Sequence, residues 1–200
     1  AKGEYLLFLN NDVEIITENW LEEMLQLCQQ KDVGMAGAKL YYPDDTIQHA
    51  GVVVGLGGVA AHVLCKLPRD AEGYMGRLRC VQEISAVTAA CMMVKTSVFK
   101  AVGGFDEELK VAFNDIDLCM KVRKYGVKIV FTPYAELYHY ESKSRGMEDT
   151  PEKQLRFSRE VNCFRRKWER ELLKGDPYYN PNLTLNNTDC SLRKQEKNGD

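Results

Sequence analysis

The chain has no apolar run long enough to cross a lipid bilayer. A spanning helix needs about 20 consecutive apolar residues, whereas the longest apolar stretch, residues 86–94, suits a buried strand. No secretory signal and no repeat period are visible. The net charge of −2 gives no reason to expect nucleic acid or an anionic membrane as a partner. With 44% hydrophobic and 28% charged residues, the 200-residue sequence is typical of one globular domain with a sizeable core.

The cysteines form no C-x-x-C pair of the kind found in zinc and redox sites. Their number is seven, which is odd, and several lie among apolar neighbours, as buried free thiols do. The pattern argues against a disulfide framework and against a zinc site with cysteine ligands. We therefore expect a reducing, cytoplasmic location, with peripheral association at the inner membrane left open.

Predicted strands alternate with predicted helices, and a hairpin interrupts them. The apolar runs predict strands at residues 5–9, 33–42, 85–95, 127–131 and 135–140, and a hairpin around a glycine-rich loop within residues 47–64. Helical spacing and capping residues predict helices that follow Thr17, begin near Asp115 and begin at Pro151, the last ending at Gly175. This order predicts a mixed α/β sandwich, in which ligands gather at the carboxyl ends of strands.

The first predicted strand begins almost at the first residue, without a lead-in segment. We therefore expect the sequence to be the later part of a longer protein. Residues 1–175 are predicted to form the domain. Residues 176–200 are polar and asparagine-rich, and they predict an extended arm that is partly disordered.

Two acidic clusters stand where predicted elements begin or end. Asn10 and Asp12 directly follow a strand, where they could bind a hard cation such as Mg²⁺ or Mn²⁺ or could simply form a turn. Asp115 follows Phe113 at a helix start, and a carboxylate at a cleft edge can accept a proton from a substrate hydroxyl. Acidic residues at a helix start also stabilise the helix dipole, and this structural role is the one preferred for Asp117.

A third cluster combines a histidine with an arginine. His139 ends an apolar strand, and Arg145 follows six residues later beside a glycine, where it could bind phosphate. A lone histidine is more often structural than functional, and that interpretation is given to His49 and His62.

Taken together, these stretches resemble the family 2 glycosyltransferases of the GT-A fold. The resemblance runs from GEYLLFLNNDVEI through SAVTAACMMVKTSVFKAVGGFDEEL and AFNDIDLCMKVRKYG to ELYHYESKSRG. Within the family, the sequence looks most like bacterial enzymes that build O-antigen, rhamnan and other surface polysaccharides. The resemblance implies a GT-A-like mixed sheet flanked by helices. It also implies that the strands forming most of the nucleotide site would precede this chain.

The resemblance also implies roles for individual residues. Residues 10–12 occupy the place of the family's DxD motif, so Asp12 and His139 would bind Mn²⁺ or Mg²⁺. Asn10 and Arg145 would contact the donor diphosphate, and Asp115 would be the catalytic base. The residues implied on the acceptor side are Gly104, Phe105, Asp106 and Asn114.

The implied reaction is transfer of a sugar from a UDP- or dTDP-sugar donor to a hydroxyl of a growing cell-surface polysaccharide, with inversion at the anomeric carbon.

Asn10 and Asn114 stand where carboxylates are usual. Together with the missing nucleotide half, they leave an alternative, a non-catalytic module that binds a glycan or a partner within a polysaccharide synthase. A metal-dependent phosphohydrolase using Asp12 and Asp115 fits less well, because such enzymes assemble more carboxylates or histidines. The chain alone is expected to be inactive if the nucleotide half lies outside it.

Overall fold

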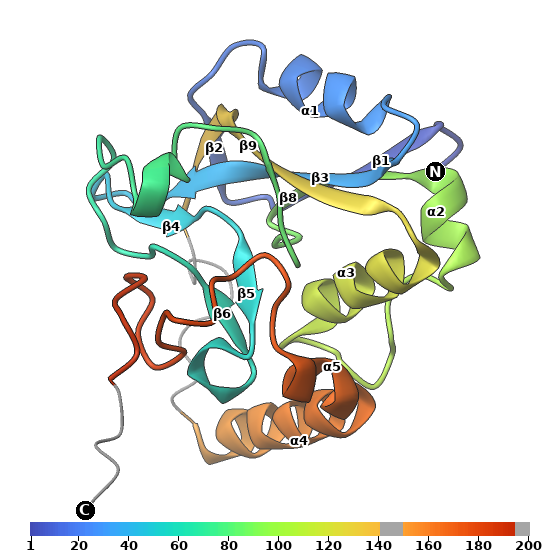
Figure 1. Cartoon of the computed structure of the whole chain (residues 1–200). Helices are drawn as coiled ribbons and strands as arrows, with labels where there is room; N and C mark the ends of the chain where they lie inside the picture. Colours follow the sequence, from blue (N-terminus) through green and yellow to red (C-terminus); the bar gives the residue numbers. More distant parts are fainter. Residues whose placement is uncertain (141–149, 195–200) are drawn as a thin grey trace, which may run out of the picture.

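A mixed sheet forms the centre of the protein, and this computed structural model describes residues 1–140 and 150–194 (Figure 1). The sheet has the strand order β1-β8-β3-β9-β2, with β4 beside β3 and β7 beside β9. Its strands are β1 (Tyr5–Leu9), β2 (Val13–Ile15), β3 (Val33–Tyr41), β4 (Ile47–His49), β7 (Gln82–Glu83), β8 (Cys91–Lys95) and β9 (Lys128–His139). A separate hairpin consists of β5 (Val52–Val54) and β6 (Ala60–His62). The predicted mixed α/β architecture with a hairpin is confirmed.

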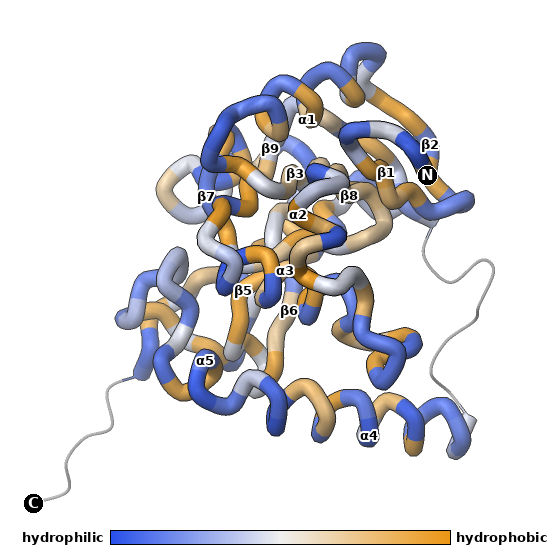
Figure 2. The backbone as a smooth tube through the Cα atoms, turned by 90° about the vertical axis from the view of Figure 1, so that its right-hand side faces the viewer, coloured by the Kyte–Doolittle hydropathy of each residue, from blue (hydrophilic) through white to orange (hydrophobic). Residues whose placement is uncertain are grey.

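The helices lie on both faces of this sheet. They are α1 (Trp20–Cys28), α2 (Thr96–Ala101), α3 (Asn114–Tyr125), α4 (Pro151–Lys167) and α5 (Glu169–Lys174), with 3-10 turns η1 (Leu56–Gly58) and η2 (Tyr74–Gly76). Helix α1 covers one face, and α3, α4 and the hairpin lie on the other (Figure 1). Apolar segments lie along the strands, whereas α4 alternates hydrophilic and hydrophobic segments (Figure 2), as expected for a helix with one face on the core.

Strand β3 is buried over its whole length, as expected for a strand covered on both faces. It runs parallel to β9 and antiparallel to β8. A side chain at Gly37 would place its Cβ 2.3 Å from Val87, so only glycine lets residues 85–90 pass this close to the strand. Residues 86–90 therefore lie over the sheet. The predicted strand at residues 85–95 is wrong in its first half and begins at Cys91.

The predicted break at Pro133 is also wrong, because β9 continues through it. Proline cannot donate a ladder hydrogen bond. The pairing with β3 accommodates this by shifting register, from Gly37 opposite Phe131 to Lys39 opposite Glu136. The extra residues form a bulge that absorbs the proline.

The long helix predicted to end at Gly175 is interrupted at Trp168, where φ is −113°. The Trp168 indole is buried and donates a hydrogen bond of 2.8 Å to Asp117 Oδ1. Phe164, one turn earlier, is buried in the same core. Helix α4 therefore packs back on the domain through this contact with Asp117 of α3, and the helix-dipole role preferred for Asp117 stays a prediction.

Residues 176–194 lie against the β5–β6 hairpin. Gly57 donates its N–H to the Leu185 carbonyl at 2.8 Å, and Leu64 donates to Thr188. The predicted boundary at residue 175, between the domain and a C-terminal arm, stays a prediction.

None of the helices in the described parts of the chain has both the length and the apolar character needed to cross a membrane.

Candidate functional site

The turn after β1 brings Asp12 to His139. Strand β2 begins one residue after Asp12, and its Val13 pairs with His139 of β9. The Tyr140 N–H donates to the Asp12 carbonyl at 2.8 Å, which fixes the backbone of the turn. As a result, Asp12 Oδ1 lies 3.3 Å from His139 Nε2. The Asn10 amide nitrogen lies 3.0 Å from the same ring nitrogen.

Gln48 of β4 fixes the tautomer of His139. The Gln48 amide donates to the His139 carbonyl at 3.2 Å, so its oxygen must face the ring, 2.7 Å from Nδ1. An amide oxygen there accepts a hydrogen bond, which places the ring N–H on Nδ1 and leaves the Nε2 lone pair directed toward Asp12 and Asn10. A metal-binding histidine needs this arrangement, in which a fixed partner holds the second ring nitrogen.

The donor atoms around His139 suit a divalent cation only in part. An imidazole nitrogen and a carboxylate oxygen are suitable ligands for Mn²⁺. However, within residues 1–140 and 150–194, no three His, Cys, Asp or Glu side chains gather closely enough to hold a metal ion. Magnesium sites built from one or two carboxylates take their remaining ligands from water and substrate phosphates. The residues present therefore fit a cation that is shared with a bound phosphate.

Asp115 lies in the first turn of α3, after a residue with strained backbone. Phe113 caps the helix in the left-handed region, at φ 63°, a conformation that costs a bulky residue about 1–3 kcal/mol. Its ring packs 5.4 Å from Phe164 of α4, which holds it there. The Asp115 carboxylate accepts hydrogen bonds from its own helix, at Ile116 (2.8 Å), and from the Ala89 N–H (3.1 Å). Asp115 is thus held by backbone from two separate segments.

Asp115 and His139 line one cavity of about 490 Å³. Its walls come from β4, β6, α3, α4 and the segments that connect them. The other lining residues include Gln48, His62, Cys65, Thr88, Val111, Ala112, Phe113, Phe157 and Thr188. The structure therefore brings together Asp12, Asn10 and His139 by direct contact, and His139 and Asp115 through a shared cavity.

Sequence reasoning missed Gln48 and His62. His62 was interpreted as structural, yet it lines the cavity, and its Nδ1 lies 3.1 Å from Nδ1 of the buried His49. His49 Nε2 faces the Thr88 N–H at 3.5 Å, so His49 carries its proton on Nδ1 and donates it toward His62. The signal available in the sequence was position: Gln48 and His49 precede a predicted hairpin, and His62 ends it.

Burial lowers the pKa of His49 well below 6.5, and nearby His62 and His139 lower it further. In the unfolded chain, His49 takes up a proton near pH 6.5, whereas in the folded protein it stays neutral. The unfolded state therefore binds more protons below that pH. We expect unfolding free energy to be fully retained above about pH 6.5 and to fall by up to about 1.4 kcal/mol per pH unit below it.

Urea unfolding of the wild type and of His49→Gln, at about pH 7.5 and about pH 5.5, measures this effect. The variant is expected to lose less stability between the two conditions than the wild type. Equal losses in the two proteins would contradict the assignment of a neutral, buried His49.

None of the residues predicted on the acceptor side is among those that line the cavity, although Asn114 precedes Asp115, which does line it. Phe105 packs edge-on against Phe8, 5.0 Å between ring centroids, and Asp106 forms an ion pair with Lys167. Gly104 accepts a hydrogen bond from Lys121 through its carbonyl. Asn114 Oδ1 accepts the Asp115 N–H at 2.7 Å, directly beside the cavity. Their acceptor-side role stays a prediction, and Arg145 lies outside the described residues.

The fold belongs to the GT-A class of glycosyltransferases. The mannosyltransferase PcManGT from Pyrobaculum calidifontis, solved with GDP-Man and Mn²⁺, matches with a TM-score of 0.53 and 15% identity, over 85% of this chain and 40% of that one. Residues 1–160 match the family described as "Glycosyltransferase like family". The chain belongs to this family, and the predicted fold is confirmed.

Two curated relatives match nearly the whole chain. The uncharacterized protein y4gI of Sinorhizobium fredii is 56% identical over 96% of this chain, and the O-antigen biosynthesis protein RfbC of Myxococcus xanthus is 40% identical over 100% of it. This chain spans only 21% and 15% of their lengths. The predicted resemblance to enzymes of surface-polysaccharide synthesis is thereby confirmed.

Proposed function

We propose that this chain carries the catalytic and metal-binding side of a glycosyltransferase site that moves a sugar from a nucleotide-sugar donor to a hydroxyl of a growing cell-surface polysaccharide. The observation that carries the proposal is the shared cavity of Asp115 and His139, with Asp12 in contact with His139. Family membership supports glycosyl transfer. The name of RfbC supports a surface polysaccharide as the product. A nucleotide-sugar donor, UDP- or dTDP-linked, is consistent with the cytoplasmic location proposed for the protein.

Asp12 and His139 would hold the divalent cation, Mn²⁺ or Mg²⁺, and Asn10 and Arg145 would contact the donor diphosphate. The complex of PcManGT with GDP-Man and Mn²⁺ supports a metal in this fold. When bound, such an ion supplies positive charge that stabilises a departing diphosphate. The chain's own contribution is to present the Nε2 lone pair of His139, through its hydrogen bond to Gln48.

Asp115 would act as the catalytic base. Its carboxylate is held in place by the Ala89 and Ile116 N–H groups, one on each oxygen. Its carboxylate would accept the proton of the attacking hydroxyl as the new glycosidic bond forms. His62 and Thr88 line the same cavity and would orient the acceptor. Attack from the face opposite the diphosphate inverts the anomeric carbon.

Titration calorimetry on the protein produced from its complete gene tests the proposal. UDP- and dTDP-sugars are expected to bind in the presence of Mn²⁺ and to bind far more weakly after chelation. Donor binding that is unaffected by chelation, or glycan binding without any donor binding, would instead favour the non-catalytic module.

Gln48→Leu is expected to weaken Mn²⁺ binding by about 10- to 100-fold, the usual effect of losing a partner that orients a metal-binding histidine. Leucine has a similar size but cannot accept the hydrogen bond that His139 Nδ1 donates to Gln48. The measurement is Mn²⁺ affinity by electron paramagnetic resonance, with Gln26→Leu on the outer side of α1 as the control. Equal Mn²⁺ affinities of Gln48→Leu and wild type would contradict this role.

A further inference from the structure

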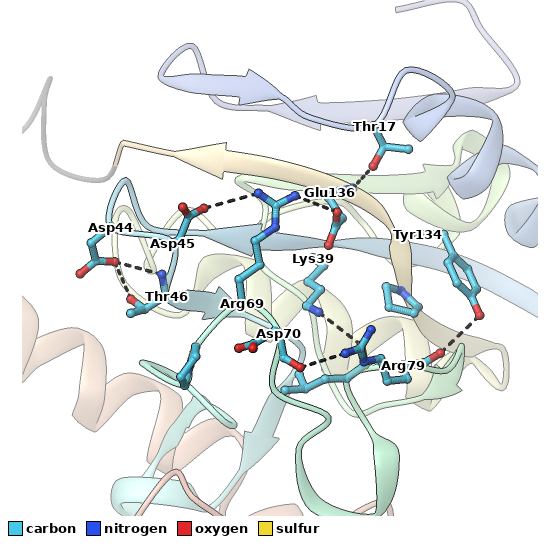
Figure 3. Close-up of a pocket in the computed structure, with 13 residues that line it drawn as sticks. Thr17, Lys39, Asp44, Asp45, Thr46, Arg69, Asp70, Arg79, Tyr134 and Glu136 are labelled. Carbon is cyan, nitrogen blue, oxygen red and sulfur yellow. Dashed lines mark hydrogen bonds and ion pairs between the residues drawn. The ribbon is translucent and has the colours of Figure 1, made fainter.

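A second and larger cavity, of about 830 Å³, lies on the other side of the turn that follows β3. Two short segments of the chain border both cavities. In the first segment Tyr42 lines the first cavity and Asp44 the second, and in the other segment Cys65 lines the first cavity and Pro68 the second. Figure 3 shows the nitrogen ends of Lys39 and Arg79 near one another, whereas the Arg69 guanidinium lies between Asp45 and Glu136. The proposed transfer reaction uses none of these residues.

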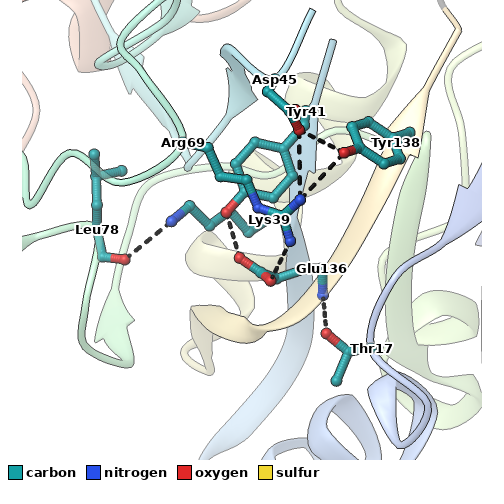
Figure 4. Close-up of polar contacts among 8 residues, drawn as sticks. All are labelled: Thr17, Lys39, Tyr41, Asp45, Arg69, Leu78, Glu136 and Tyr138. Carbon is teal, nitrogen blue, oxygen red and sulfur yellow. Dashed lines mark hydrogen bonds and ion pairs between the residues drawn. The ribbon is translucent and has the colours of Figure 1, made fainter. Parts of the chain in front are cut away.

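The carboxylates at one end of this cavity already have internal partners (Figure 4). Glu136 Oε2 lies 3.2 Å from the Arg69 guanidinium, and Glu136 Oε1 accepts a hydrogen bond from the buried Tyr41 hydroxyl. Asp45 Oδ1 accepts from the Tyr138 hydroxyl at 2.5 Å and pairs with Arg69 at 3.4 Å. Both carboxylates therefore have hydrogen-bond partners within the protein, and the single Arg69 guanidinium is shared between them.

Within the described chain, the cations at the other end donate hydrogen bonds only to backbone carbonyls, and the Lys39 ammonium also lies 5.3 Å from the centroid of the Tyr41 ring. Lys39 is 4% exposed, and its ammonium donates to the Leu78 carbonyl at 3.3 Å. Arg79 donates to the Asp70 carbonyl at 2.9 Å. Among the described residues, neither side chain forms an ion pair. A buried ammonium without a carboxylate partner is costly, and burial accordingly lowers the pKa of Lys39. Both groups keep N–H donors that an anionic ligand could satisfy.

The wall beside these cations can hold a sugar ring. Tyr134 is 53% exposed and lines the cavity next to Pro133. Its hydroxyl donates to the Arg79 carbonyl at 3.3 Å, which holds the ring beside the arginine. An exposed aromatic ring next to charged hydrogen-bonding groups presents an apolar surface and a polar edge together.

We propose that this cavity binds a saccharide unit that carries an anionic group, with Lys39 and Arg79 contacting the anion and Tyr134 contacting the ring. The anion is a sugar carboxylate or a sugar phosphate, since the ammonium and the guanidinium bind both. The proposal rests on this cavity alone and does not depend on the transfer reaction proposed for the other one.

NMR titration of the protein with glucuronate, glucose 6-phosphate, inorganic phosphate and glucose tests the site. At least one of the two acidic sugars is expected to bind at least about tenfold more tightly than glucose, because only an anion forms charge-assisted hydrogen bonds. Which of the two binds better identifies the anion. Lys39→Met and Arg79→Gln are each expected to weaken that binding by about tenfold or more, whereas Lys100→Met, on the exposed side of α2, should leave it unchanged.

Arg79 is exposed, so Arg79→Gln is expected to fold even if Lys39→Met does not. The proposal would be overturned if neither acidic sugar binds, or if glucose binds as tightly as the acidic sugars. It would also be overturned if both Lys39→Met and Arg79→Gln leave acidic-sugar binding unchanged. Inorganic phosphate that binds as tightly as glucose 6-phosphate, with glucuronate not binding, would show an anion site without a sugar and would also overturn it.

Discussion

Asp115→Asn is expected to lower the turnover of sugar transfer by about 100- to 10,000-fold, the usual contribution of a general base. The substitution removes the proton acceptor but keeps the size of the side chain. Donor affinity is expected to stay within about threefold, because the proposed diphosphate contacts are Asn10 and Arg145 and the proposed metal ligands are Asp12 and His139. Initial rates of sugar transfer, with donor affinity measured separately, give the two quantities.

The Ala89 and Ile116 N–H groups donate hydrogen bonds to different oxygens of Asp115, and an asparagine side chain has only one oxygen. Asp115→Asn is therefore also expected to lose about 1–3 kcal/mol of unfolding free energy. Thermal unfolding shows whether the variant is still folded at the assay temperature. The matched control is Glu22→Gln, an exposed carboxylate on α1, which covers the opposite face of the sheet. A folded Asp115→Asn enzyme with near wild-type turnover would rule out Asp115 as the base.

Glu160→Ala is expected to cost about 3 kcal/mol or more of unfolding free energy. This carboxylate on α4 is 3% exposed and accepts three backbone N–H groups in a row, from Lys110 (3.1 Å), Val111 (3.2 Å) and Ala112 (2.7 Å). Alanine leaves all three donors without this partner, and a buried unpaired donor costs about 1–3 kcal/mol. For a chain of this size, the melting temperature should fall by roughly 6–12 °C.

Glu160→Ala is also expected to lower activity at temperatures where the protein stays folded, because Val111 and Ala112 form a wall of the Asp115 cavity. Glu152→Gln, an exposed change in the first turn of the same helix, is the control and should cost less than about 1 kcal/mol. A Glu160→Ala protein as stable as this control would show that the 110–112 segment is held by other contacts.

The sequence predicted those features that depend on local pattern. The apolar run of residues 5–9 followed by Asn10 and Asp12 indicates a strand end with oxygen donors. The capping residues before Pro151 indicate a helix start, and Thr150 does accept the Lys153 N–H. These features could be predicted because their causes lie within a few residues of one another.

The features that were missed depend on pairing between distant segments. Gln48 reaches His139 because β4 joins the sheet beside β3, and no local pattern indicates that contact. His62 lines the cavity through the fold of the β5–β6 hairpin. Pro133 would interrupt an ordinary strand, but the register shift against β3 accommodates it. Lys39 stands in an apolar strand, and only the three-dimensional structure shows that it faces a polar cavity.

Histidine-selective NMR during addition of Mn²⁺ tests the central claim, that Asp12 and His139 present a cation site where His139 borders the cavity of Asp115. The paramagnetic ion broadens signals steeply with proximity, so the His139 imidazole signal should disappear first at substoichiometric Mn²⁺ with donor present. The His49 signal should disappear later, because its buried ring contacts His62 and Thr88 rather than Asp12. A His139 signal that stays sharp while the donor binds in a Mn²⁺-dependent manner would contradict the account.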